Sequence, residues 1–285
     1  MELLAHMDVP RVFLHHTKDE RPDPSSFLSH CHDAYEIIYV AQGKGRYIVE
    51  GKEYRMSPNT LLLLPPHSFH YVEPSADTAY ERYVFHFREN SLPEEGRGLL
   101  KPFGCGEKER EGENGMSPGK VHFYSSELLP SHIGAIFARM DAVELLPKSQ
   151  RAQFAGMLLA ETLMLLAVTS PAESATNGEP LGEQIAHYLH AHLTEPMSLD
   201  KLSSRFYVSK FYLCRVFKEH NGASILRYVT EKRVFLAKQY LEEGDTAVSA
   251  AARAGFGDYS SFFRAYKKII GSAPKQEKDK RERPE

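Results

Sequence analysis

Residues 198–222, SLDKLSSRFYVSKFYLCRVFKEHNG, decide the fold of the last third of this chain, because their pattern returns 49 residues later in residues 247–271, AVSAAARAGFGDYSSFFRAYKKIIG. The equivalent positions share apolar, aromatic or basic character, and both copies close on a glycine. The pairs are Leu199 and Val248, Leu213 and Phe262, Arg215 and Arg264, Phe217 and Tyr266, Lys218 and Lys267, and Gly222 and Gly271. One supersecondary unit therefore occurs twice.

Each copy predicts two helices around a short turn. In the first copy Ser198 and Ser209 stand at the N-caps, and in the second copy Thr246 and Asp258 do. Glycine ends the second helix of each copy. A longer helix joins the copies, with apolar side chains at helical spacing: Leu226, Val229, Leu236, Ala237, Tyr240 and Leu241. We predict an all-α domain of two helix-turn-helix units joined by a long helix.

The second helix of such a unit enters the major groove of DNA, so its exposed residues just after the cap face base edges. Arg215 and Arg264 suit base reading, because a guanidinium pairs bidentately with guanine. The lysines one turn onward suit phosphates. The predicted DNA contacts are Lys210, Phe211, Cys214, Arg215 and Lys218 in the first copy, and Tyr259, Ser260, Ser261, Arg264, Lys267 and Lys268 in the second. The alternative is an ordinary basic helix face, and the repeated arginine argues against it.

The segment from Leu181 to Lys275 resembles the arabinose-regulator (AraC/XylS) family of transcription regulators. Its marks are SKFYLCRVFK, which matches S-x-x-Y-L-x-R-x-F-K, and the run from Gly255 to Pro274, which matches GF-x-D-x-S-x-F-x-R, then KK and G-x-x-P. The resemblance implies DNA binding, transcription activation and contact with RNA polymerase. One departure is VSAAARAGF, where the family has an Ile-Ala pair, so we expect looser packing on the second recognition helix.

Charge and composition agree with two domains. The net charge is −3, but residues 181–285 hold 18 Lys and Arg against 13 Asp and Glu, which favours a polyanion partner for that part. The most apolar run, from Phe154 to Val168, is shorter than the roughly 18 to 20 residues that a bilayer requires. The start of the chain does not look like a secretion signal, so we expect a cytoplasmic protein without a membrane partner. The three cysteines lack the spacing of a disulfide framework or a zinc finger.

The first part of the chain carries strand signals in residues 35–40, 46–49, 61–64 and 80–87, which predict an all-β barrel or sandwich. Residues 89–120 are expected to form a loop, and residues 127–146 and 149–168 to form helices. The predicted fold is therefore α+β with two domains. Residues 1–170 form a cupin-like β-barrel with flanking helices, residues 171–180 a linker, residues 181–276 the double helix-turn-helix domain, and residues 277–285 a charged, disordered tail.

The stretch from His30 to Gly43 resembles the first motif of the cupin superfamily, and His70 stands where the last cupin ligand would be. In an extended strand His30, His32 and Glu36 share one face, which suits either a divalent transition metal or a small organic effector. We predict the effector, because His67 stands where the second cupin motif has glycine. The resemblance to the AraC/XylS family implies a sensor barrel that often keeps the H-x-H-x-x-x-E stretch without using a metal, with carbohydrate as that family's commonest substrate class. The predicted effector residues are His30, His32, Glu36, Tyr47 and His70, with no metal and no cofactor.

The helix predicted at residues 149–168 has more apolar surface than packing on one barrel requires, which favours a homodimer. The apolar residues are Phe154, Met157, Leu158, Leu165 and Leu166, and packing inside the monomer is the alternative. The predicted function is a DNA-binding transcription regulator, controlled by a small effector, and not an enzyme. The rivals are a metal-dependent cupin enzyme with a helical appendage and an effector-binding protein that never contacts DNA.

Overall fold

The computed structural model describes residues 2–9, 12–88, 91–92, 94–103, 120–130, 132–171 and 180–274. The described residues up to 171 form one unit, and residues 180–274 form a second. Most of the predicted linker, the predicted tail and most of the expected loop lie outside the described residues. Residues 94–103 of that expected loop form a 3-10 helix, η3 (Glu94–Phe103). None of the helices described is long and apolar enough to cross a bilayer.

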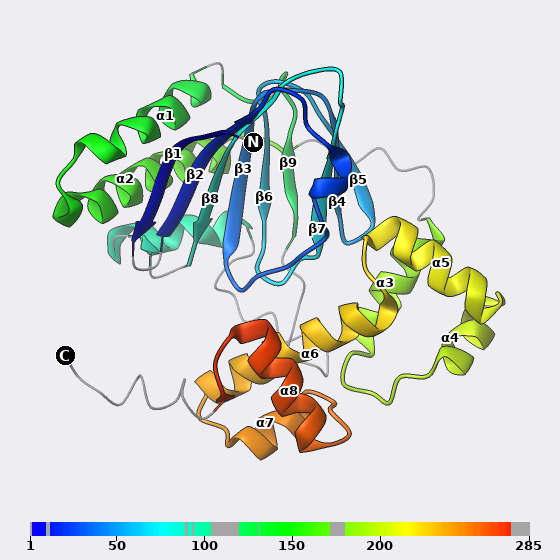
Figure 1. Cartoon of the computed structure of the whole chain (residues 1–285). Helices are drawn as coiled ribbons and strands as arrows, with labels where there is room; N and C mark the ends of the chain where they lie inside the picture. Colours follow the sequence, from blue (N-terminus) through cyan, green and yellow to red (C-terminus); the bar gives the residue numbers. More distant parts are fainter. Residues whose placement is uncertain are drawn as a thin grey trace. The chain divides into compact units, whose positions relative to one another are not determined.

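The strands of the first unit form two antiparallel sheets (Figure 1). The large sheet has the order β1 (Glu2–Val9), β2 (Val12–Asp19), β8 (Tyr80–Phe87), β3 (Tyr35–Gln42), β6 (Thr60–Leu64) and β9 (His122–Tyr124). The small sheet has the order β5 (Lys52–Met56), β4 (Gly45–Val49) and β7 (His70–Pro74). A short 3-10 helix, η1 (Pro24–Ser26), precedes β3. The four predicted strands are confirmed, and the other five were missed.

The predicted barrel is two separate sheets that enclose a common core. Large side chains fill that core: Ile38, Val40, Leu62, Leu64 and Val84 from the large sheet, and Tyr47, Val49, Tyr54, Met56 and Val72 from the small one. Within the described part of the chain an isolated bridge joins His30, before β3, to His70 at the start of β7. Strand patterns alone left both a barrel and a sandwich open, because closure depends on which edges pair across long stretches of sequence.

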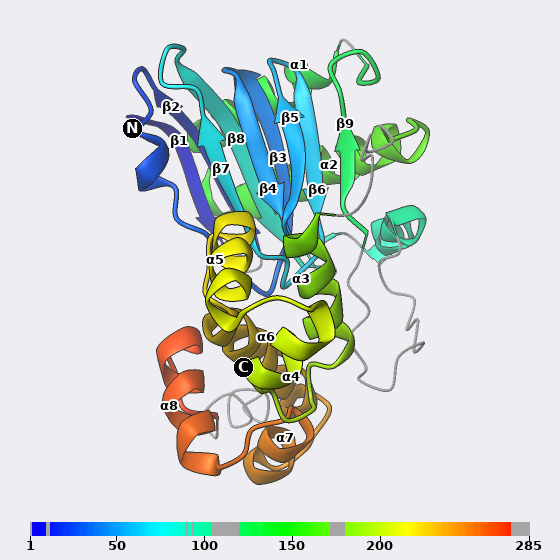
Figure 2. The same cartoon turned by 90° about the vertical axis from the view of Figure 1, so that its right-hand side faces the viewer.

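Helices cover the other face of the large sheet. Figure 2 shows α1 (Ile133–Met140) and α2 (Lys148–Ala167) behind it, with the 3-10 helix η4 (Asp141–Leu145) between them in sequence. Phe137 stacks on Tyr39 of β3, with ring centroids 4.5 Å apart. Because the sheet is covered on both faces, β6 is buried at every position, which explains its uninterrupted TLLLL sequence.

The second unit is entirely helical where it is described. It comprises α3 (Leu181–Ala191), α4 (Leu199–Phe206), α5 (Lys210–Asn221), α6 (Ile225–Glu242), α7 (Ala247–Arg253) and α8 (Tyr259–Ile270). All four predicted N-caps are confirmed, because each side chain accepts a hydrogen bond from a backbone amide of its own first turn. Gly222 and Gly271 end α5 and α8 in the left-handed conformation. The helices α5 and α8 lie towards opposite ends of α6 (Figure 1).

Candidate nucleic-acid interface and ligand site

The two predicted recognition helices bury equivalent side chains and expose equivalent arginines. Leu213 and Phe217 of α5 are buried, as are Phe262 and Tyr266 at the matching positions of α8. Arg215 and Arg264 are exposed. The periodicity of each helix therefore turns its arginine away from the core, so that the guanidinium can reach a partner.

The other predicted contact residues share the outer faces of these helices. Lys210, Phe211, Lys218, Tyr259, Ser260, Lys267 and Lys268 are exposed, whereas Cys214 and Ser261 are half-buried. Sequence reasoning missed one neighbour, Tyr212, which is exposed and lies with its ring 5.3 Å from the Arg215 guanidinium. The sequence already places Tyr212 in the same helical turn as Phe211 and Arg215, and this placement could have indicated its exposure. Lys210 is paired with Asp200 of α4, its Nζ lying 2.5 Å from the carboxylate oxygen.

One loop, residues 192–195, packs against both the linking helix α6 and the second helix-turn-helix unit. Arg233 of α6 donates hydrogen bonds to the backbone carbonyls of Leu193 (2.8 Å) and Glu195 (2.6 Å). Gly255, in the turn of the second unit, lies against the backbone of Thr194. The loop therefore contacts both the linking helix α6 and the turn of the second helix-turn-helix unit. These contacts restrain the spacing of α5 and α8.

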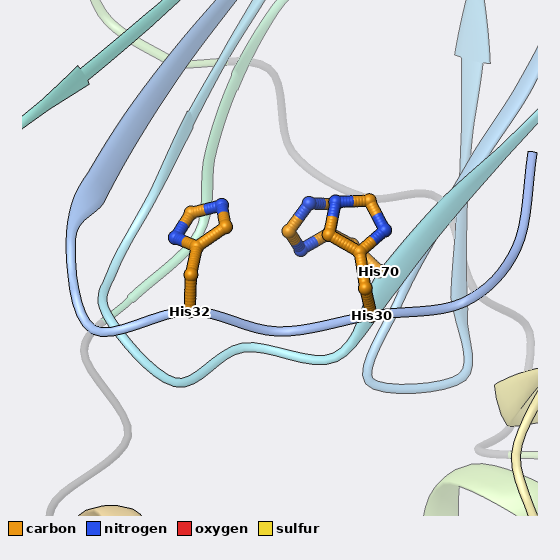
Figure 3. Close-up of side chains that lie close together, drawn as sticks. All are labelled: His30, His32 and His70. Atoms are coloured by element: carbon orange, nitrogen blue, oxygen red, sulfur yellow. The ribbon is translucent and has the colours of Figure 1, made fainter. Parts of the chain in front are cut away.

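In the N-terminal, sheet-containing unit, a buried carboxylate is surrounded by imidazoles. The Glu36 side chain, only 5% exposed, has His32 Nε2 3.0 Å and His70 Nε2 2.9 Å from its Oε2, and His86 Nε2 3.1 Å from its Oε1. His70 and the nearby His30 and His32 are drawn in Figure 3. The predicted residues His30, His32, Glu36 and His70 are thus brought together, although His30 and His32 precede β3 and do not lie in a strand.

The sequence prediction missed His86, which comes from β8. Its α-carbon is the direct partner of that of Glu36 across the β3–β8 ladder, so both side chains emerge on the same face. The signal was present in the strand predicted at residues 80–87, but the partner strand could not be known. The remaining predicted residue, Tyr47, is buried in the core between the sheets, with its hydroxyl 3.3 Å from that of Tyr80.

The electrostatics of this cluster depend on Glu36. Burial would raise the pKa of Glu36, but the neighbouring imidazoles, His70 foremost, outweigh burial and hold that pKa well below its usual range. Burial would lower the pKa of His70, but Glu36 outweighs it and raises that pKa above its ordinary value. Burial, with nearby Arg82 and His86, lowers the pKa of His15 on β2 to about 4. At neutral pH Glu36 is therefore an anionic carboxylate, and the nearby His15 is a neutral imidazole.

Comparison with known proteins assigns both units. Residues 18–168 match the model of the AraC-like ligand binding domain, and residues 202–280 match that of a helix-turn-helix domain. Because the first match alone spans more than half of the chain, the protein belongs to the AraC family: it is a DNA-binding transcription regulator with an N-terminal effector-binding domain.

Similar proteins span nearly the whole chain. The HTH-type transcriptional activator RhaS of Klebsiella pneumoniae is 24% identical over 258 residues, covering 90% of this chain and 89% of the relative. RhaS of an Enterobacter species is 23% identical over 259 residues, covering 90% of each chain. Among solved structures, an apo form of ToxT from Vibrio cholerae is 12% identical with a TM-score of 0.40, covering 94% of this chain and 97% of that one.

Proposed function

We propose that this regulator is a cytoplasmic transcription activator that acts as a homodimer, contacts RNA polymerase, and reads DNA with α5 and α8. The observation that carries the DNA-reading assignment is the equivalence of Arg215 and Arg264, each exposed on a helix whose opposite face is buried. The RhaS relatives are named as transcriptional activators, which supports activation. For the same reason we propose that the protein is not an enzyme.

Within the DNA interface, we assign base reading and phosphate binding to different residues. Arg215 and Arg264 pair with guanine edges in two successive major-groove segments, about 34 Å apart on one face of the duplex. Lys218, Lys267 and Lys268 contact phosphates and position the helices without reading sequence. Phe211 and Tyr259, exposed just after the caps, contact thymine methyl groups or the sugar-phosphate backbone.

We assign effector binding to the surroundings of Glu36. His30, His32, Glu36 and His70 supply polar groups, while Tyr47 belongs to the apolar wall between the sheets. Binding changes transcription if the ligand has a higher affinity for one arrangement of the protein than for another.

The dimer surface that we propose differs from the one expected from the sequence. Leu158 and Leu166 are buried in the core of the first unit, and Phe154 and Leu165 pack against that core. For these four residues the alternative of packing inside the monomer holds, because η3, α1 and η4 as well as the sheet contact α2. Met157 and Met164, 54% and 57% exposed and seven residues apart, share another face of α2. We propose that this methionine face forms the homodimer contact.

Selection of bound fragments from random DNA by the full-length protein tests the proposed function. We expect an enriched site with two sequence elements about one helical turn apart for each protomer. A pool that shows no sequence enrichment after repeated selection, while the protein remains folded by circular dichroism, contradicts the proposal. Enrichment of a single element would show that only one unit reads DNA.

A further inference from the structure

We propose that the effector-binding unit binds one divalent transition-metal ion, held by Glu36 and the imidazoles of His32, His70 and His86, and that this ion is a ligand to which the regulator responds. The response rests on the proposed function, whereas the binding of the ion does not. The proposal concerns the direct surroundings of Glu36, and it adds a ligand from β8 that lies outside the H-x-H-x-x-x-E stretch.

The arrangement of donor atoms carries the proposal. Three imidazole nitrogens, supplied by the segment before β3, by β7 and by β8, lie 2.9–3.1 Å from the two oxygens of one buried carboxylate. Around a tetrahedral ion with bonds of about 2.0–2.1 Å, neighbouring donor atoms are roughly 3.3 Å apart. Each of the three nitrogen–oxygen distances therefore lies within a few tenths of an ångström of the spacing that such an ion requires.

The second observation concerns the hydrogen bonds of His70. Its Nδ1 lies 2.9 Å from the carbonyl oxygen of Ser68, and since a carbonyl only accepts, Nδ1 carries the hydrogen. Its Nε2 faces Glu36 Oε2 across 2.9 Å, and an ion bound there would displace any proton that Nε2 carries. This Nε2 is buried, and no hydrogen-bond partner satisfies it. A ligand imidazole whose other nitrogen donates to a backbone carbonyl is the usual second-shell arrangement at metal sites.

The other two rings show the same deficiency. His86 Nε2 is buried and lacks a hydrogen bond of good geometry, although it lies 3.1 Å from the carboxylate. His32 uses Nε2 towards Glu36 and leaves Nδ1 buried without a partner. A buried polar atom without a partner costs free energy, and three occur around one carboxylate. A single cation between Glu36 and the rings would satisfy the Nε2 atoms of His70 and His86 together.

The donor set selects the class of ion. Imidazole suits zinc, copper, iron and nickel, whereas magnesium and calcium prefer sites made of oxygen. Three imidazoles and one carboxylate therefore favour a transition-metal ion of the zinc type.

His30 is the competitor of His86 for this role. His30, His32 and His70 can also bring one donor atom each within 4.8 Å of one another, as can His32, Glu36 and His86. We choose His86 because it approaches the carboxylate directly and is its ladder partner, whereas His30 is exposed and donates its Nδ1–H to Leu28. The two assignments predict different mutants.

Calorimetric titration of the full-length protein, first freed of metal with a chelator, tests binding with zinc chloride. We expect one ion per chain. The variants Glu36→Gln and His86→Gln should bind at least about 100-fold more weakly, because even outer-shell partners of a metal are worth about 10–100-fold in affinity. His30→Gln and the control His122→Gln, which removes another buried histidine of the same unit, should change the affinity less than about threefold.

Cobalt(II) serves as a second probe, because its visible absorption reports tetrahedral coordination even if a variant is less stable. The bands should appear in the parent protein and in His122→Gln, and disappear in His86→Gln. Failure of the folded parent protein to bind zinc overturns the proposal. A His86→Gln variant that binds like the parent protein, with binding lost in His30→Gln, overturns the assigned ligand set.

The response to the ion is tested separately with DNA selected by the metal-free protein. We expect at least a threefold change in affinity for this DNA when zinc is added, and a zinc-binding protein whose DNA affinity does not change would overturn the sensing role. Loss of DNA selection with intact zinc binding contradicts the proposed function instead, so the two failures are distinguishable.

Discussion

Gly255, in the turn of the second helix-turn-helix unit, lies so close to Thr194 that a β-carbon at position 255 would be 2.6 Å from the Thr194 carbonyl oxygen. The φ angle of Gly255 is +86°, a region that other residues rarely adopt. The obstacle is backbone, which cannot rotate away as a side chain can. Because it has no side chain, Gly255 thus permits the contact between the 192–195 loop and the second helix-turn-helix unit.

Gly255→Ala should lower the unfolding free energy of the helical unit, residues 180–274, by more than about 2 kcal/mol. A positive φ alone costs about 1–2 kcal/mol, and the clash with the Thr194 backbone adds to that cost. Two other glycines separate the causes. Gly244 has a φ of +105° but open space around it, so Gly244→Ala should cost only the backbone contribution. Gly257 has neither feature, and Gly257→Ala should be nearly neutral. Thermal unfolding followed by circular dichroism measures all three, and equal losses in the 244 and 255 variants would contradict the contact.

Arg233→Met should destabilise the same loop. The guanidinium donates two hydrogen bonds to backbone carbonyls, and hydrogen bonds of charged groups contribute about 1.5–3 kcal/mol. We expect a loss of at least about 2 kcal/mol, and weaker binding to DNA with both sequence elements than to DNA with one. Arg227→Met, which removes an exposed arginine of the same helix, is the control and should cost under about 1 kcal/mol. Denaturant titration and DNA binding by anisotropy provide the two readouts.

Arg215→Ala and Arg264→Ala should each weaken binding to the selected DNA by about 1–3 kcal/mol and relax specificity at separate base positions. Lys218→Ala should instead weaken binding to all sequences alike and reduce the dependence on salt by about one ion, because it removes a phosphate contact. Repeating the DNA selection with each variant shows which base position changes. Unaltered specificity in both arginine variants would exclude them as base readers.

If the protein forms the proposed homodimer, Met157→Glu together with Met164→Glu should convert it to a monomer, because two charges would then lie on the proposed contact. Analytical ultracentrifugation of the full chain at micromolar concentration measures the change. Leu28→Glu places a charge on another exposed apolar residue of the unit, 75% exposed, and should leave the dimer intact. A parent protein that sediments as a monomer rules out the methionine surface as a dimer contact under these conditions.

Most of the helical unit could be predicted from the sequence because its signals are local. An N-cap such as Ser209 or Asp258 bonds an amide within the next three residues, and a helix face repeats over a few positions. The outward direction of Arg215 and Arg264 follows from that periodicity, together with the buried positions two residues to either side of each arginine.

The ligand site could be predicted only in part, since its parts come from separate strands. The spacing of His30, His32 and Glu36 is visible in the chain, but the approach of His86 depends on β8 pairing with β3 in one particular register. The strands β1 and β2 were not predicted because polar and apolar residues are mixed in them. The division of the strands into two sheets results from long-range pairing. The sequence by itself determined the repeated helices, their caps and their outward arginines, which depend on neighbours a few residues away. Only the tertiary structure decided which imidazoles surround Glu36, which faces of α2 are covered, and that Gly255 lies against Thr194. Those contacts join residues that are distant along the chain.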